Sequence, residues 1–423
     1  MNRRFFLQIH SWVGVTCGLL MFLVCWSGTW AVLSHEIDWL LNPSLRAPVA
    51  AQPATWEELA RGAERASPGA YISMLNRPPA PGFAAEAWIE ARGSGQLQRV
   101  YLDPATGQAQ GTWSFFNVQR WFRDFHMRLM WPDTGQWPYY IVASMAVALL
   151  VQIVAGLVFY RKWWTRLFVL RWNRGRPALM TDLHRLGGLW SLVFTPIVVV
   201  TGLWYLVERI DANTTELIRP PARTSTVLTT SDALPLNQLV ARAQAAYPTL
   251  RIRTIQFPGS EEDPIAFTGQ DGALLVRDAA ARIELDPGNG AVTSIIRPDG
   301  LVPVVRWQET ADRVHFGDWG GLASKAFYFL FGLMLSGLCL TGAYLHIMRA
   351  STEHPLSRGP IVWTAHLITI GLLGQTIYGG WNSIRDYGTQ DAWPVFPPGV
   401  FIFLALWTLS TVFVLQWWAR KVR

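Results

Sequence analysis

Residues 7–33 read LQIHSWVGVTCGLLMFLVCWSGTWAVL, and Gly28 follows His10 by 18 positions in this run. A second stretch, residues 184–204, reads HRLGGLWSLVFTPIVVVTGLW and places His184 and Gly202 at the same spacing. Both runs are largely apolar, and about 20 apolar residues are enough to cross the hydrocarbon core of a bilayer. The two stretches therefore predict equivalent membrane spans, each with a histidine at its start.

A weaker repeat links two further histidines. His126 precedes an apolar run that ends in Gly156, and His315 precedes a run that ends in Gly342. Four histidines thus recur at corresponding ends of expected spans. This pattern indicates a symmetric pair of metal sites.

The composition fits a membrane protein, because 51% of the 423 residues are hydrophobic and only 15% are charged. We expect an α-helical membrane protein with six transmembrane helices: two repeated units of span, outer module and span, followed by a C-terminal helix pair. The expected spans are residues 1–37, 137–160, 186–207, 322–348, 361–378 and 398–418. Residues 38–136 and 208–321 are the outer modules, and residues 161–185 form a basic loop on the other side.

The basic residues predict the orientation, since short cytoplasmic loops carry an excess of Lys and Arg. Arg3 and Arg4 precede the first span, and the loop 161–185 contains seven Lys or Arg opposed only by Asp182. We therefore expect both termini and this loop to be cytoplasmic. The net charge of +7 then reflects topology, and no nucleic-acid partner is expected.

The three cysteines, Cys17, Cys25 and Cys339, all fall inside expected spans. Buried there they can act as small hydrophobic residues. The chain has no Cys-x-x-Cys-His sequence for covalent haem attachment, and three cysteines make no disulfide framework.

Each outer region carries a helix-like segment followed by alternating strands. The helical segments start near Trp56 and Leu236, and an Asp-Pro-x-x-Gly sequence follows a strand at Asp103 and again at Asp286. Proline fixes one turn dihedral and glycine accepts a positive φ, so this sequence predicts a hairpin. Each outer region is therefore expected to be a small α+β module.

These residues together resemble the PepSY-associated transmembrane family of bacterial inner-membrane proteins, and in particular its ferric-siderophore reductase branch. The resemblance covers about Phe5 to Met348 and rests on three short motifs. They are His-x-x-x-Gly at His10 and His184, Leu-Asp-Pro-x-x-Gly at Leu102 and Leu285, and His-Phe-Gly-Asp at His315. The resemblance implies PepSY-like periplasmic modules, b-type haem held by membrane histidines, and delivery of electrons to periplasmic iron chelates. The last two spans lie outside it.

Neutral imidazoles suit an electron-transfer haem, because they remain bound to the iron in both oxidation states. We expect two haem b groups per chain, one held by His10 and His184 near the cytoplasmic face and one by His126 and His315 near the outer face. His346, near the inner end of the fourth span, is an alternative ligand to His10 or His184.

Two arginines and several glycines are also expected near these sites. Arg123 and Arg185 lie close to candidate ligands and can pair with haem propionates. Glycines recur in spans one and three: Gly14, Gly18, Gly28, Gly187, Gly188 and Gly202. They serve either close helix packing or clearance for a flat macrocycle.

The expected function is a haem-containing inner-membrane reductase that passes electrons from a quinol or a cytoplasmic reductase to a periplasmic ferric-siderophore or similar iron chelate. The expected partners are membrane lipid, the iron chelate and an unidentified electron donor. The chain has no Gly-x-Gly-x-x-Gly fingerprint for a dinucleotide. One alternative is a haem-free PepSY-type periplasmic binding or regulatory membrane protein. A transporter is disfavoured, because the carboxylates nearest the apolar runs, Glu36, Asp38 and Glu208, all sit at their outer ends.

Overall fold

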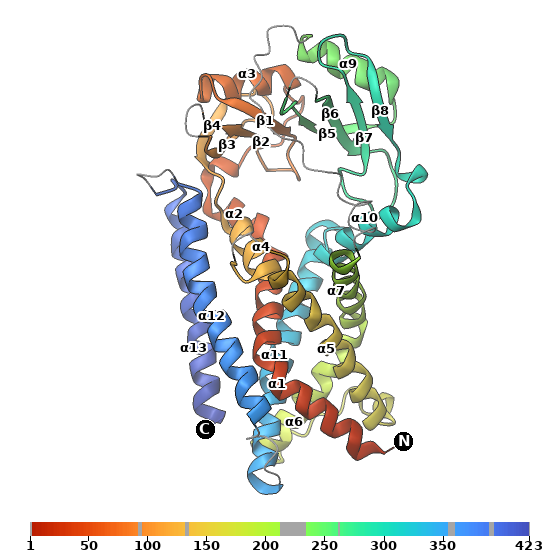
Figure 1. The fold of residues 1–423 in the computed structure, drawn as a ribbon, viewed down its shortest axis with the longest axis vertical. Coiled ribbons are helices and arrows are strands. Elements are labelled where there is room, and N and C mark those ends of the chain that lie inside the picture. The colour runs from red at the N-terminus through yellow and green to blue at the C-terminus, as the bar shows by residue number, and fades with distance from the viewer. Residues whose placement is uncertain are drawn as a thin grey trace.

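The protein is a bundle of long helices that carries a β-sheet at one end (Figure 1). This computed structural model describes residues 2–91, 95–131, 135–211, 234–260, 263–353, 360–388 and 393–422. Part of the expected second module, residues 212–233, lies outside the described residues. Helix α1 begins and helix α13 ends at the end of the bundle away from the sheet (Figure 1).

Helices of 16 to 33 residues form the bundle. They are α1 (Arg3–Ala31), α5 (Trp137–Phe159), α6 (Gly175–Trp190), α7 (Thr195–Ile210), α11 (Gly321–Glu353), α12 (Pro360–Asp386) and α13 (Pro398–Val422). Among the described residues, α1, α5, α11 and α13 are each long and apolar enough to cross a membrane, and α6 with α7 makes a fifth crossing if the bent pair is one span. The expected span 361–378 lies in α12, which packs against α1 but does not meet that criterion. The count of six spans stays a prediction.

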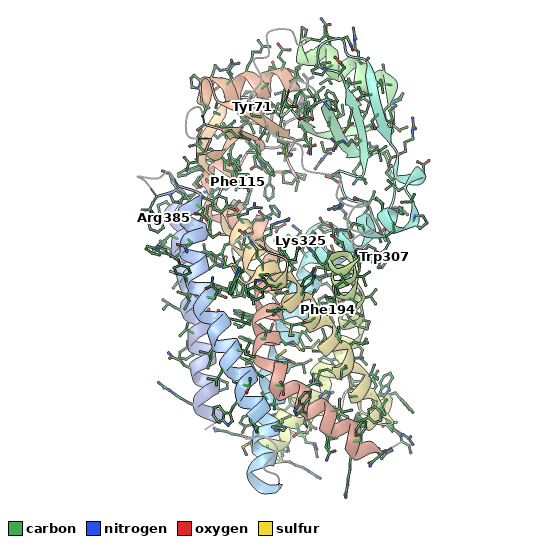
Figure 2. The ribbon with its side chains drawn as sticks, in the orientation of Figure 1. Tyr71, Phe115, Phe194, Trp307, Lys325 and Arg385 are labelled. Atoms are coloured by element: carbon green, nitrogen blue, oxygen red, sulfur yellow. The ribbon has the colours of Figure 1, made fainter. Side chains whose placement is uncertain are left out.

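The third expected span, residues 186–207, is not one straight helix. It bends by 65° between α6 and α7, across the short 3₁₀ helix η3 (Ser191–Val193). Pro196 lies in the first turn of α7, where its missing N–H is tolerated but where it cannot continue an incoming α-helix. Phe194, at the bend, lies within the bundle (Figure 2).

The two repeats interlock in the bundle. Helix α1 packs against α5 and α11, α7 packs against α5, and α6 packs against α11. Buried side chains of α1, α5, α7 and α11, together with Phe194 at the bend, meet in one apolar cluster, which includes Met21, Leu149, Val199 and Leu335. The helices of each repeat are therefore held by those of the other.

The two outer modules share one continuous sheet. The first contributes α3 (Trp56–Ala66) and strands β1 (Tyr71–Asn76), β2 (Ala85–Glu90), β3 (Leu97–Leu102) and β4 (Ala109–Ser114). The second contributes α9 (Leu236–Ala246), β5 (Arg251–Gln256), β6 (Ile265–Gln270), β7 (Ala281–Leu285) and β8 (Val292–Ile296). The strand order is β4-β3-β2-β1-β5-β6-β7-β8, and β1 pairs antiparallel with β5.

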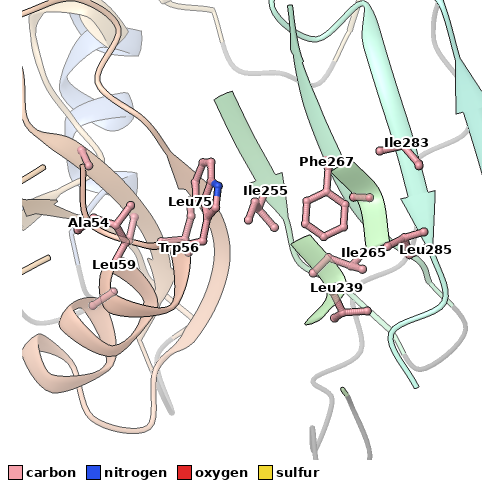
Figure 3. Close-up of a cluster of buried hydrophobic side chains, with 14 of the residues drawn as sticks. Ala54, Trp56, Leu59, Leu75, Leu239, Ile255, Ile265, Phe267, Ile283 and Leu285 are labelled. Carbon is pink, nitrogen blue, oxygen red and sulfur yellow. The ribbon is translucent and has the colours of Figure 1, made fainter. Parts of the chain in front are cut away.

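The core of this sheet lies on the face covered by α3 and α9. Leu75 and Ile255, which are partners across the β1–β5 junction, are both fully buried there, as are Leu59 of α3 and Phe267 of β6 (Figure 3). Strand side chains alternate between faces, so every second residue reaches this cluster. The burial joins both modules into one folded unit.

Both Asp-Pro-x-x-Gly sequences form matching turns. Asp103 accepts hydrogen bonds from the next two available backbone N–H groups, Asp286 does the same, and Gly107 and Gly290 have φ values of +69° and +70°. Glycine adopts this left-handed conformation without a steric penalty. The hairpin predicted at each position is present.

Short helices connect the sheet to the bundle (Figure 1). They are α2 (Ser34–Leu41), η1 (Pro43–Leu45), α4 (Val118–Arg128), η4 (Pro298–Gly300) and α10 (Pro303–Phe316), and a further 3₁₀ turn, η2 (Trp163–Arg166), lies after α5. Lys325, near the start of α11, pairs with Glu36 of α2 at 2.6 Å at the outer end of the bundle (Figure 2). Helices α4 and α10 carry His126 and His315 toward the spans.

Candidate cofactor site

Four of the five histidines predicted as ligands form two pairs in the structure. The rings of His10 on α1 and His184 on α6 have centres 6.2 Å apart. The rings of His126 on α4 and His315 on α10 also have centres 6.2 Å apart. Each pair joins equivalent positions of the two repeats, as the spacing of the motifs predicted.

This separation suits one metal ion between two imidazoles. A bond from a metal ion to an imidazole nitrogen is about 2.0 Å long, and the ring centre lies roughly 1.1 Å beyond, so two opposed rings have centres about 6 Å apart. Within the described ranges, no group of three or more His, Cys, Asp or Glu side chains could hold a metal ion. Haem iron takes its other ligands from the macrocycle, so two axial imidazoles are all that it needs from a protein.

The inner pair is oriented by hydrogen bonds at Nδ1. Nδ1 of His10 lies 3.1 Å from the carbonyl oxygen of Gln152, which can only accept. Nδ1 of His184 lies 2.9 Å from Oγ1 of Thr341, and that hydroxyl already donates to the carbonyl oxygen of Gly337. Both histidines must therefore donate from Nδ1, which leaves the lone pair of the neutral ring on Nε2.

The outer pair is oriented in the same way. Nδ1 of His126 lies 3.0 Å from the carbonyl oxygen of Val24, and Nδ1 of His315 lies 2.8 Å from Oγ1 of Thr201. The Thr201 hydroxyl donates to the carbonyl oxygen of Ile197 and so accepts from His315. Metal-binding histidines are held by second-shell acceptors of this kind.

Burial keeps the outer histidines uncharged. It lowers the pKa of His315 to about 3, with a smaller contribution from the neighbouring His126, and it also lowers the pKa of His126. Neutral imidazole is the form that binds a metal ion. Both rings are therefore in the ligating form at neutral pH.

Three of the four motif glycines, Gly28, Gly156 and Gly342, make room for a histidine, whereas a Cβ on Gly202 would lie 2.8 Å from Cβ of Ala146. A Cβ atom on Gly28 would lie 2.7 Å from Cε1 of His126, and one on Gly342 would lie 3.0 Å from Cε1 of His184. A Cβ on Gly156 would lie 3.7 Å from His10. These glycines let an imidazole pack directly on the backbone of the neighbouring helix.

The inner pair lines a cavity of about 410 Å³. Five glycines border this cavity: Gly14, Gly18, Gly156, Gly188 and Gly342. A Cβ on Gly188 would meet nothing within 4 Å, whereas a Cβ on Gly187 would approach Leu338 at 3.2 Å. Gly187 thus serves helix packing, while the bare backbone at Gly188 leaves open space in the cavity.

Three further predicted residues lie near the pairs. His346 lines the same cavity as His10 and His184, so it remains an alternative ligand. Arg185 also lines it and pairs with the buried Asp182 at 3.1 Å. Arg123 lies on α4 three residues before His126 and faces a second cavity on the outer side.

The groups that accept from Nδ1 are not among the site residues predicted from the sequence. Thr201 and Thr341 each directly precede a motif glycine, and Ser27 precedes Gly28 and lies 3.3 Å from Nδ1 of His126. The signal was therefore present as a Ser or Thr before glycine in three of the four runs. Carbonyl acceptors such as those of Val24 and Gln152 have no side-chain signal.

The similarity to known proteins is at the family level. The family model described as the PepSY-associated TM region matches residues 7–349. No curated protein matches the chain. The match covers both repeats, including all four paired histidines and the whole sheet, and so the chain belongs to the PepSY-associated TM family.

Proposed function

We propose that this protein is a transmembrane haem oxidoreductase that passes electrons to a ferric chelate outside the membrane. The observation that carries the proposal is the pair of matched histidine sites, each with ring centres 6.2 Å apart. Histidines that only pack at the ends of spans have no need to form two equivalent pairs with the same separation between ring centres. A b-type haem bound between each pair would supply a one-electron iron couple.

The two sites lie at opposite ends of α1. Gly28, which contacts His126, follows His10 by 18 residues on this helix, a rise of about 27 Å. The hydrocarbon core of a bilayer is about 30 Å thick. The chain thus offers one ligand pair at each side of a membrane.

The residues around each pair serve to hold and orient the cofactor. Gln152, Thr341, Val24 and Thr201 fix the four imidazoles through Nδ1, and this contact makes each histidine a stronger ligand. At the inner site, Arg185 is proposed to face a haem propionate while Asp182 and Arg171 hold its position. The open space at Gly188 admits a macrocycle.

The proposed acceptor is a ferric-siderophore or similar chelate. One electron converts its ferric iron to ferrous iron, which hard oxygen ligands hold less tightly. We propose that both termini are cytoplasmic in a bacterial inner membrane and that the shared sheet is periplasmic. The electron donor is then a quinol or a cytoplasmic reductase.

Stopped-flow mixing tests this function. Purified haem-loaded protein is reduced anaerobically with dithionite, freed of excess reductant and mixed with ferric citrate in the presence of a ferrous-specific chelator. We expect oxidation of the haem band and formation of one ferrous ion per electron. His315→Ala should slow this reaction, whereas His366→Ala, which changes a histidine of α12 outside both pairs, should not.

A persistently reduced spectrum with no ferrous iron would contradict the proposal. A protein that contains no haem after expression with a haem precursor would also contradict it. Either result would favour the haem-free binding or regulatory protein.

A further inference from the structure

A second cavity of about 410 Å³ lies between the first module and the bundle. It is bordered by α2, by α4 and by strands β2, β3 and β5. Phe115, which also lines it, lies between the sheet and the helical bundle (Figure 2). The cavity is therefore on the sheet side of the outer histidine pair.

Arginine side chains outnumber carboxylates around this cavity. The lining contains five arginines and three carboxylates: Arg77, Arg99, Arg120, Arg123, Arg253, Asp38, Glu86 and Asp278. A concave surface with an excess of one charge attracts ligands of the opposite charge.

The three carboxylates are already engaged by the protein. Glu86 accepts a hydrogen bond of 2.8 Å from Arg99, and Asp278 lies 3.6 Å from Arg253. Asp38 accepts from the backbone N–H groups of Val118 and Gln119 at the start of α4. None of these three acids forms an ion pair with Arg77, Arg120 or Arg123, the other arginines of the lining.

The uncompensated arginine closest to the outer histidine pair is Arg123. This side chain is exposed, and in the part of the chain that the structure describes it makes no hydrogen bond or ion pair. Arg120, by contrast, donates to the hydroxyl of Tyr387 at 2.7 Å. Arg123 is three residues from His126 on the same helix, a spacing that places side chains on one face about 5–6 Å apart at Cβ.

We propose that this cavity selects an anionic, oxygen-rich iron chelate, such as a polycarboxylate complex, and that Arg123 is its principal contact. The inference rests on the proposed function and adds the charge class of the acceptor. Guanidinium groups match carboxylate oxygens in bidentate geometry. A chelate held by Arg123 lies one helical turn from His126, the ligand proposed for the outer haem.

Calorimetric titration tests the proposal without electron transfer. Haem-loaded protein is titrated with gallium(III) citrate, which is anionic and not reduced, with a neutral gallium(III) trihydroxamate, and with citrate alone. We expect gallium citrate to bind more tightly than the neutral chelate and more tightly than free citrate. Its affinity should fall as ionic strength rises, since exposed charges are screened by salt.

Matched variants locate the contact. Arg123→Gln should weaken binding of gallium citrate by about tenfold or more, because a hydrogen bond to a charged group is lost. Arg123→Lys should retain part of the affinity. Arg65→Gln, which changes an exposed arginine of α3 outside the cavity lining, should leave the affinity unchanged.

The outcomes separate this inference from the proposed function. Equal binding of neutral and anionic chelates, or unchanged binding in Arg123→Gln, overturns the inference even if the protein still reduces ferric iron. Loss of haem from Arg123→Gln with unchanged chelate binding overturns it too and assigns Arg123 to a propionate. Arg123-dependent binding by a protein that has no haem would sustain the anion site and reject the oxidoreductase.

Discussion

At the scale of single residues, the proposed haem binding depends on how each imidazole is held. Every paired histidine donates from Nδ1 to an oxygen of a neighbouring helix, within 3.1 Å. Two of these oxygens are threonine hydroxyls that have a backbone acceptor of their own. The tautomer and the ring orientation are thereby set before any ligand binds.

Replacing Gly28 by alanine should displace His126. The new Cβ would lie 2.7 Å from Cε1 of that ring, so the imidazole or α1 must move. We expect the haem content to fall from about two to about one per chain, as measured by pyridine haemochrome. Gly371→Ala in α12 is the matched control, because its Cβ would meet nothing within 4 Å, and a similar haem loss there would reject the explanation.

Replacing Thr201 by valine should weaken the outer site without emptying it. The change removes the acceptor of the His315 Nδ1–H at constant side-chain shape. Loss of such a second-shell contact lowers metal affinity by about 10- to 100-fold. Haem titration of the apoprotein measures this, Thr201→Ser should retain most of the affinity, and equal affinities for all three proteins would contradict the role assigned to the hydroxyl.

At the scale of elements, the position of His126 depends on α4. The carboxylate of Asp38 accepts from the N–H groups of Val118 and Gln119 at 2.8 and 2.9 Å, while Asn117 caps the same helix end through Arg120 N. These contacts satisfy donors that a helix N-terminus leaves open. They also fix α4 to α2, and through it to the outer end of α1.

Asp38→Ala should therefore destabilise the outer site. The buried N–H of Val118 would lose its acceptor, at a cost of about 1–3 kcal/mol, and the partly buried N–H of Gln119 would lose its acceptor as well. Thermal melts should show a lower unfolding temperature, and haem quantification should show preferential loss of the outer haem. Asp38→Asn retains one acceptor oxygen and should lie between the alanine variant and the parent; an alanine variant as stable as the parent would exclude this function of Asp38.

The elements also show what the sequence could and could not predict. The hairpins at Asp103 and Asp286 follow from local turn chemistry, and the four histidines follow from the repeat. The bend between α6 and α7 was missed, although Pro196 lies beside it, because proline is tolerated inside membrane-spanning helices and does not by itself predict a break. The backbone acceptors of His10 and His126 could not be predicted, since every residue has a carbonyl group.

At the scale of the whole molecule, the two modules form one sheet. The junction joins β1 to β5, strands about 180 residues apart in the sequence. Each module taken alone reads as a complete helix-plus-hairpin unit, so no local pattern predicts that their edge strands pair. The number of spans is likewise not determined, because α12 does not meet the criterion of length and apolarity that α13 meets.

Ile255→Ala should loosen both modules at once. Ile255 and its partner Leu75 are fully buried at the junction, and truncating a buried isoleucine costs about 2–5 kcal/mol. Hydrogen exchange should show faster amide exchange in β2 and β3 as well as in β6 and β7. Leu97→Ala, at a position 37% exposed, is the control, and faster exchange confined to the second module would show that the modules unfold independently.

Haem binding by the two histidine pairs can be tested by measuring the haem content of the purified protein, by optical spectrum and pyridine haemochrome, in the parent chain and in two histidine variants. The account predicts about two haems per chain in the parent and about one in both His10→Ala and His315→Ala, with His366→Ala unchanged. A colourless protein from cells supplied with a haem precursor, or a haem content that neither paired-histidine variant lowers, would contradict it.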